Sequence, residues 1–134
     1  MSIAKKSAEN ISKVLIEALP YIQKFSGKTI VIKYGGSAMS DAYLRKSFAR
    51  DIVLMKTVGI NPIIVHGGGP QIQKGLKRAK IESEFISGVR VTSPEIINTV
   101  QKVLDNEVNK EIKELINSWG GNAQALSGKR SSFI

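Results

Sequence analysis

The pattern of apolar residues at the start of the chain predicts a helix followed by a strand. Over residues 11–25 they recur every three or four positions, which predicts an amphipathic helix. Pro20 lies inside this stripe and predicts a kink, or two short helices meeting there. Residues 29–32 (Thr-Ile-Val-Ile) form a β-branched run between Gly27 and Gly35, which is typical of a strand buried on both faces.

The next segment adds a helix, a strand and a second helix. From an N-cap at Ser40 or Asp41, helical spacing continues to Gly59. Residues 63–65 (Ile-Ile-Val) form a second buried-strand run, and helical spacing resumes after Pro70. Two strands joined by one helix are most simply parallel with a right-handed crossover, so we expect both glycine-rich loops at the carboxyl edge of one sheet.

The last third predicts a hairpin and a long helix. Residues 85–92 alternate weakly around Gly88, as in a β-hairpin. Ser93 is a capping residue and Pro94 suits the first helical position. The predicted apolar stripe of the helix is Ile97, Val100, Leu104, Val108, Ile112 and Leu115.

The end of the chain predicts two further strands. Glycines 120–121 end the long helix before a strand-like segment at residues 123–126. Residues 132–134 look like the opening of another strand, with no closing cap or polar tail after it. We therefore expect the sequence to be truncated. The pattern as a whole indicates an α/β fold.

The amino-acid composition excludes several kinds of site and of protein. The chain has 134 residues, is 42% hydrophobic and contains no cysteine and one histidine, which fits one globular domain and excludes disulfides and a cysteine nucleophile. Residues 1–10 resemble neither a signal nor a transit peptide, and no apolar run suits a membrane. We expect a protein of the cytoplasm, or of the plastid stroma if plastid-encoded, without a membrane partner or a metal site in this segment.

The net charge of +9 raises the alternative of a non-catalytic basic module that binds nucleic acid or a protein. Lysines lie among acids, as in Lys110, Glu111, Lys113 and Glu114, and no basic–aromatic stacking motif is present. This distribution favours solvated helix faces and no nucleic-acid partner. A small anionic substrate is equally compatible with the positive excess.

Lys33 and the glycines after it are a candidate phosphate site. Lys33 follows the first strand, and Gly35 and Gly36 leave the backbone amides accessible. A fixed ammonium beside such amides can stabilise a phosphoryl group in transfer. The alternative is a tight strand-to-helix turn with a surface lysine.

The second loop, residues 66–70 (His-Gly-Gly-Gly-Pro), lets the backbone approach a ligand at a helix amino end. It matches neither a Walker motif nor a dinucleotide fingerprint. His66 is a candidate general base, but phosphorylation of a carboxylate needs none, so we favour a structural hydrogen-bonding role. Arg90 in the hairpin can clasp a carboxylate, although an ordinary exposed arginine is the alternative. Together these features predict a site for an anionic substrate and a phosphoryl donor.

Six runs resemble the acetylglutamate kinases of the amino acid kinase superfamily. They are residues 33–39, 51–62, 66–72, 88–92, 108–110 and 126–129, in this order. The resemblance implies a three-layer αβα sandwich with a mainly parallel central sheet, of which this chain is the N-terminal lobe. It also implies transfer of the γ-phosphoryl group of ATP, with Mg2+, to the side-chain carboxylate of N-acetyl-L-glutamate in arginine biosynthesis.

The resemblance assigns a role to each candidate residue. Lys33 would stabilise the transferring phosphoryl group, and Gly35 and Gly36 would face the phosphates of ATP. Gly68 and Gly69 would contact acetylglutamate, and Arg90 would hold its α-carboxylate. The chain departs from the family at 73–74 (Gln-Lys) and 130–131 (Arg-Ser), which we expect to be surface turns.

The resemblance also predicts organisation and partners. Residues 1–26 would be a kinked-helix oligomerisation arm, and residues 27–134 the acetylglutamate-binding lobe, truncated before the ATP-binding lobe and therefore inactive alone. A homo-oligomer is expected, either a dimer or a hexamer joined by the arm, with L-arginine as inhibitor and the PII signalling protein as partner in some members. Carbamate, glutamate and aspartate kinases share the glycine loops and are the alternative, which residues 88–92 (Gly-Val-Arg-Val-Thr) argue against.

Overall fold

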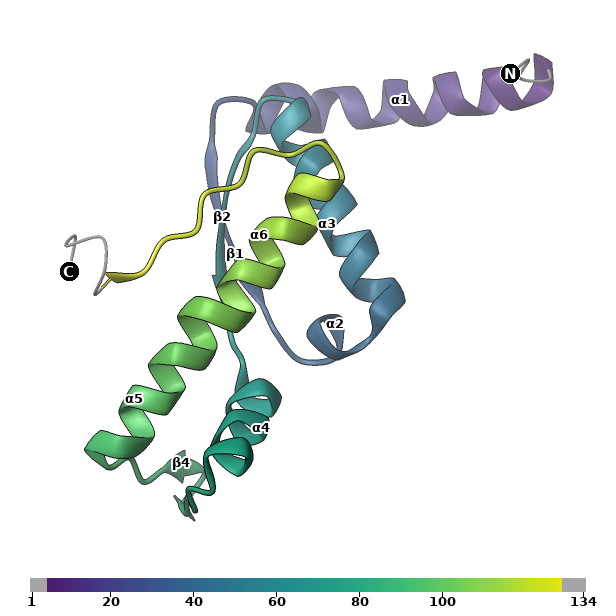
Figure 1. Cartoon of the computed structure of the whole chain (residues 1–134). Helices are drawn as coiled ribbons and strands as arrows, with labels where there is room; N and C mark the ends of the chain where they lie inside the picture. Colours follow the sequence, from purple (N-terminus) through teal and green to yellow (C-terminus); the bar gives the residue numbers. More distant parts are fainter. Residues whose placement is uncertain (1–4, 129–134) are drawn as a thin grey trace.

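The computed structural model describes residues 5–128, without the side chains of Lys5 and Ser37, and shows an α/β fold (Figure 1). The elements are α1 (Lys5–Phe25), β1 (Thr29–Tyr34), α2 (Ser37–Ser40), α3 (Ala42–Thr57), β2 (Asn61–His66), α4 (Gly69–Ala79), β3 (Phe85–Ile86), β4 (Val89–Arg90), α5 (Pro94–Lys102), the π-helical segment η1 (Val103–Val108) and α6 (Asn109–Ser118). The predicted class, α/β with a parallel sheet, is confirmed.

Strands β1 and β2 pair in parallel, with α3 as the crossover between them. The register runs from Thr29 opposite Asn61 to Tyr34 opposite His66. One more backbone hydrogen bond continues the pairing past the strands, because the Gly67 amide donates to the Tyr34 carbonyl oxygen at 2.9 Å. Both glycine-rich loops therefore begin at the same edge of the sheet, as the sequence predicts.

The two faces of this sheet differ in burial. Ile32 and Ile64 pack on one face against a buried cluster formed by Ala49, Ile52 and Ile116 of α3 and α6. The expectation that both strands are buried on both faces is wrong for the described chain, since the opposite face leaves Val31 65% exposed, Ile63 50% and Val65 54%. The reason is that α3 and α6 cover the face of Ile32 and Ile64, and β-branched side chains on the other face have no comparable cover.

Helix α3 begins and ends where its local signals predict. Asp41 is the N-cap, and its Oδ1 accepts a hydrogen bond from the Leu44 amide at 2.8 Å. Gly59, with φ of 90°, follows the last turn in a left-handed conformation that favours glycine. Arg45 of α3 also pairs with Glu111 of α6, which joins the two helices at the surface.

The predicted hairpin and the start of the long helix are confirmed. Strands β3 and β4 are antiparallel, and Ser87 and Gly88 between them have φ of 49° and 80°. Two successive positive φ angles are the signature of a tight hairpin turn whose twist matches the strands. Ser93 then caps α5, its Oγ accepting from the Ile96 amide at 3.3 Å, with Pro94 in the first turn.

The long helix contains a π-helical segment that shifts its buried face. In η1 the Asn109 amide bonds to the Leu104 carbonyl oxygen, five residues earlier. The predicted stripe begins at Ile97, which is wrong, because Ile97 is 52% exposed while Ile96 is 6% exposed. Val103 and Val108 are both buried although they are five residues apart, a spacing that an uninterrupted α-helix would place on different sides.

The strand expected after the long helix is absent from the described residues. The segment 123–126 forms no strand and is held instead by side chains. The Ala123 amide donates to Asn117 Oδ1 at 2.7 Å, and Asn109 Nδ2 donates to the Leu126 carbonyl oxygen at 2.8 Å. These two asparagines occupy one backbone donor and one backbone acceptor that a strand ladder would use. The strand expected at residues 132–134 lies outside the described residues.

Helix α1 is one continuous helix across Pro20, so the alternative of two short helices is wrong. It extends away from the rest of the chain (Figure 1). Its outward apolar side chains are Ile11, Val14, Leu15, Ile16 and Leu19, which are between 48% and 65% exposed. Among the described residues, no helix is long and apolar enough to cross a membrane.

Segment η1 packs closely on α4, and Gly75 makes this approach possible. A Cβ atom at Gly75 would lie 2.4 Å from Val103 Cγ2, and Val103 is buried. Alanine normally stabilises a helix interior over glycine by about 0.5–1 kcal/mol. Overpacking a core costs about 1–3 kcal/mol, and the β-branched Val103 has few alternative rotamers. We therefore expect Gly75→Ala to lower the free energy of unfolding, measured by urea denaturation.

The double variant Gly75→Ala/Val103→Ala separates these two effects. With the valine methyl groups removed, the new Cβ has room, so adding Gly75→Ala to Val103→Ala should be neutral or stabilising. If Gly75→Ala destabilised both backgrounds equally, the contact with Val103 would not be the cause.

Candidate functional site

The candidate site lies at the carboxyl edge of the parallel sheet. Lys33 is exposed, on the uncovered face of β1, and is paired with Val65 of β2. The next residue, Tyr34, bonds to Gly67 as described, so the two glycine-rich loops leave the sheet side by side. The structure thereby brings Lys33 and both loops to one edge, as the sequence predicts.

The glycines of the two loops differ in what surrounds them. A Cβ atom added to Gly35, Gly36 or Gly69 would meet no described atom within 4 Å, so their backbone is open to a ligand. A Cβ at Gly68 would instead lie 2.6 Å from Leu104 Cδ2 of η1. A side chain at Gly68 would therefore displace the end of Leu104, a contact between η1 and the loop that the sequence pattern did not reveal.

Helix α4 presents its amino end to this edge. Gly68 is the N-cap and offers no capping side chain, Pro70 lies in the first turn, and that turn has no acidic residue. The first amides of a helix have no partner within the helix and carry partial positive charge. An anionic group is the ligand that such an end accommodates.

Arg90 joins the site through α4. Its Nη2 donates to Gln73 Oε1 at 3.1 Å, its Nη1 donates to Ser83 Oγ, and the guanidinium lies 4.5 Å from the ring centre of Phe85. Gln73 lies one helical turn beyond Gly69. The guanidinium therefore stands beside the same helix whose amino end follows the glycine loop.

Surface turns were expected at residues 73–74 and 130–131, and the structure describes only the first pair. Gln73 and Lys74 are not in a turn but within α4, and Gln73 contacts Arg90. That expectation is wrong, because the contact joins residues 17 positions apart and no local signal marks it. Residues 130–131 lie outside the described residues. Gln73 and Ser83 are therefore contacts of Arg90 that sequence reasoning missed.

His66 makes a local hydrogen bond. Its Nδ1 donates to the Gly67 carbonyl oxygen at 2.9 Å. This bond holds the imidazole against the backbone of the glycine loop and accounts for the residue without a catalytic role, in keeping with the structural interpretation.

Tyr34 anchors the end of β1 between Lys33 and Gly35. Only 3% of Tyr34 is exposed, its ring stacks on Phe48 with centroids 3.9 Å apart, and its hydroxyl donates to the Ala38 carbonyl oxygen at 2.9 Å. Burial raises the pKa of the phenol above its ordinary value, with a smaller opposing effect from Arg45. Because the side chain is fixed in the core, the backbone on either side of it is fixed as well.

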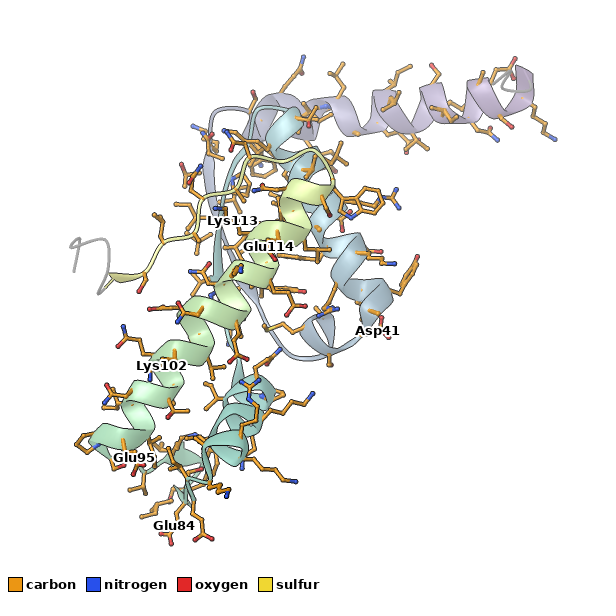
Figure 2. All side chains as sticks on the ribbon, in the orientation of Figure 1. Asp41, Glu84, Glu95, Lys102, Lys113 and Glu114 are labelled. Carbon is orange, nitrogen blue, oxygen red and sulfur yellow. The ribbon has the colours of Figure 1, made fainter. Side chains whose placement is uncertain are left out.

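Charges along the long helix argue against a nucleic-acid surface. Glu95, Lys102, Lys113 and Glu114 follow one another along α5 and α6 (Figure 2). Lys110 also lies 3.8 Å from Glu114 in an i, i+4 pair. Mixed signs along the helix are typical of a solvated surface rather than of a track for phosphates.

Comparison with known proteins identifies the family. A profile described as the amino acid kinase family matches residues 28–134. This chain belongs to the amino acid kinase family. The match includes both strands of the parallel sheet, both glycine loops and the hairpin that carries Arg90.

Individual relatives show which members of the family the chain resembles. Over the whole chain, the sequence is 58% identical to an acetylglutamate kinase of Hydrogenovibrio crunogenus and 56% identical to one of Nitrosococcus oceani. The chain spans only 45% and 44% of the lengths of these two proteins. It therefore resembles less than half of a family member.

A solved structure shows the same fold. An N-acetylglutamate synthase of Neisseria gonorrhoeae, crystallised with coenzyme A and L-arginine, superposes with a TM-score of 0.57 at 22% identity. The superposition covers 83% of this chain and 26% of the synthase chain. At this identity the likeness supports the fold alone.

The buried phenol of Tyr34 predicts a pH-dependent stability difference. A raised pKa means that the folded state holds the phenol proton more tightly, so its contribution is complete below about pH 10 and is lost as the pH rises through the folded pKa. We expect Tyr34→Phe to lower the free energy of unfolding by about 1 kcal/mol at pH 8 through the lost hydroxyl bond. The difference from wild type should shrink in more alkaline solution, as measured by urea denaturation.

Tyr43→Phe is the matched control, because Tyr43 is 76% exposed. It should leave the unfolding free energy unchanged at every pH tested. A Tyr34→Phe difference that stayed constant through the alkaline range would contradict the argument from burial.

Proposed function

We propose that this chain is the substrate-binding lobe of an acetylglutamate kinase. The full-length protein would transfer the γ-phosphoryl group of MgATP to the side-chain carboxylate of N-acetyl-L-glutamate, in arginine biosynthesis. The observation that carries the proposal is the identity of 56–58% to acetylglutamate kinases along the whole chain. The open glycine backbones and the anion-compatible end of α4 support it.

The reaction matches the groups at the sheet edge. A carboxylate oxygen of acetylglutamate forms a bond to the γ-phosphorus while the bond from that phosphorus to the bridging oxygen breaks, leaving ADP. The carboxylate is already ionised at neutral pH, so no general base is needed and His66 is free to remain structural. What the reaction requires is positive charge and amide donors around the phosphoryl oxygens.

We assign these tasks residue by residue. Lys33 stabilises the phosphoryl group in transfer, and the amides of Gly35 and Gly36 face the phosphates. Gly68 and Gly69 contact the acetylglutamate, and Arg90 binds its α-carboxylate. Support comes from the exposed position of Lys33 and from the partial burial of Arg90, whose guanidinium is fixed beside α4.

The ATP-binding lobe would lie in the remainder of the full-length protein. The chain spans less than half of its relatives' length, so we propose that residues 1–134 alone do not turn over. We divide the chain into an arm, residues 1–26, and the acetylglutamate-binding lobe, residues 27–134. Carbamate, glutamate and aspartate kinases, and the basic binding module, receive no support from the relatives' names.

The bare apolar face of α1 supports a role in assembly. A helix that exposes Ile11, Leu15 and Leu19 outside the core is suited to packing against another copy. We propose that the arm joins dimers into a hexamer. L-arginine as inhibitor, the PII signalling protein as partner, and the cytoplasm or plastid stroma as location are carried over from the resemblance as further proposals.

In the full-length protein, the role of Arg90 predicts a loss of acetylglutamate affinity, and the role of Lys33 predicts a loss of kcat. Loss of a carboxylate clamp should weaken acetylglutamate binding by about 1.5–3 kcal/mol in Arg90→Ala, measured by calorimetry. Lys33→Ala removes charge stabilisation of the transition state, so kcat should fall by about a hundredfold or more with little change in acetylglutamate affinity.

Lys102→Ala is the control, because it also removes one positive charge, on the exposed surface of α5. It should leave the acetylglutamate affinity and kcat unaltered. If Arg90→Ala bound acetylglutamate as tightly as Lys102→Ala, Arg90 would not be the clamp, and if Lys33→Ala kept its kcat, Lys33 would not be catalytic.

The assembly role predicts a change in mass. Deleting residues 1–24 from the full-length protein, or introducing Leu15→Asp into the apolar face of α1, should convert a hexamer to dimers, as measured by light scattering. Asn10→Asp makes the same acidic residue at another exposed position of α1 and should keep the hexamer. An unchanged mass after the deletion would show that α1 does not join subunits.

A further inference from the structure

Three residues of the chain contact the guanidinium of Arg90. Gln73 of α4 accepts from Nη2 at 3.1 Å, Ser83 accepts from Nη1, and the ring of Phe85 lies against the group at 4.5 Å. Arginine is otherwise among the most flexible side chains, with a large loss of rotamer freedom when it is ordered. Because these contacts within the chain already order Arg90, a ligand that binds it does not have to do so.

The two hydrogen bonds leave enough donors for an anion. A guanidinium has five N–H groups, and Gln73 and Ser83 occupy one each. The remaining N–H groups can serve the two oxygens of a carboxylate. Both acceptors are neutral, so the positive charge of Arg90 is not cancelled by either contact.

We propose that Gln73 is a positioning residue for Arg90, and that its neutral amide keeps the guanidinium charge available to an anionic substrate. This inference rests on the proposed role of Arg90 in binding the α-carboxylate of acetylglutamate. An acid at position 73 would hold the guanidinium even more strongly. It would also neutralise it and compete with the substrate carboxylate.

A purely structural role for Gln73 leads to a different expectation. In that case the bond to Arg90 would only fasten the hairpin to α4, and a carboxylate in its place would fasten it at least as well. Gln73→Glu therefore separates the two roles. A structural contact tolerates the acid, whereas a substrate-positioning contact does not.

The experiment compares steady-state kinetics of full-length Gln73→Glu, Gln73→Ala, Arg90→Ala and Lys74→Gln. Lys74→Gln is the matched control, because it changes the net charge by the same amount at the adjacent exposed position of α4. We expect Gln73→Glu to raise KM for acetylglutamate by about tenfold, and Gln73→Ala by about threefold through a less ordered Arg90. In both variants kcat and KM for ATP should stay near wild type, and Lys74→Gln should match wild type.

The melting temperature of each variant checks that it folds, and calorimetry with acetylglutamate measures the same effect without turnover. If Gln73→Glu and Gln73→Ala bound acetylglutamate like Lys74→Gln while Arg90→Ala did not, the inference would be wrong and the proposed function would stand. A loss confined to kcat would also overturn it. If Arg90→Ala itself bound normally, the proposed role of Arg90 would fail and the inference with it.

Discussion

The parallel pairing of β1 and β2 is the constraint on which the site depends. Its register places Lys33 beside Val65 and Tyr34 beside His66, and the bond from Gly67 to Tyr34 extends it into the loops. Because parallel strands end at the same edge, side chains that are more than thirty positions apart in sequence come together without a long loop. Tyr34, the last residue of β1, stacks on Phe48, and this contact fixes the end of the strand next to Lys33.

Helix α4 connects the sheet edge to Arg90. Segment η1 lies close to the second glycine loop through Leu104 and packs on α4 so closely that Gly75 has no room for a side chain. This packing sets the direction of α4, whose first turn faces the loop and whose second turn contacts Arg90 through Gln73.

Local signals predicted most of the elements and the three motifs of the site. Asp41 and Ser93 are caps because their side chains replace a missing helical partner, a choice that neighbouring residues alone decide. Contacts between distant residues were not visible in this way. The π turn moved the buried position from Ile97 to Ile96, and the link between Gln73 and Arg90 depends on how α4 meets the hairpin. Neither follows from spacing within one element.

We propose that the sheet edge, the amino end of α4 and Arg90 form one site for an acidic amino acid derivative. A crystal structure of the full-length protein with N-acetyl-L-glutamate tests it most directly. We expect the α-carboxylate of the ligand on the Arg90 guanidinium, with Gln73 still bonded to Nη2, and the rest of the ligand along Gly68 and Gly69. A ligand bound elsewhere, with Arg90 uninvolved, would contradict it.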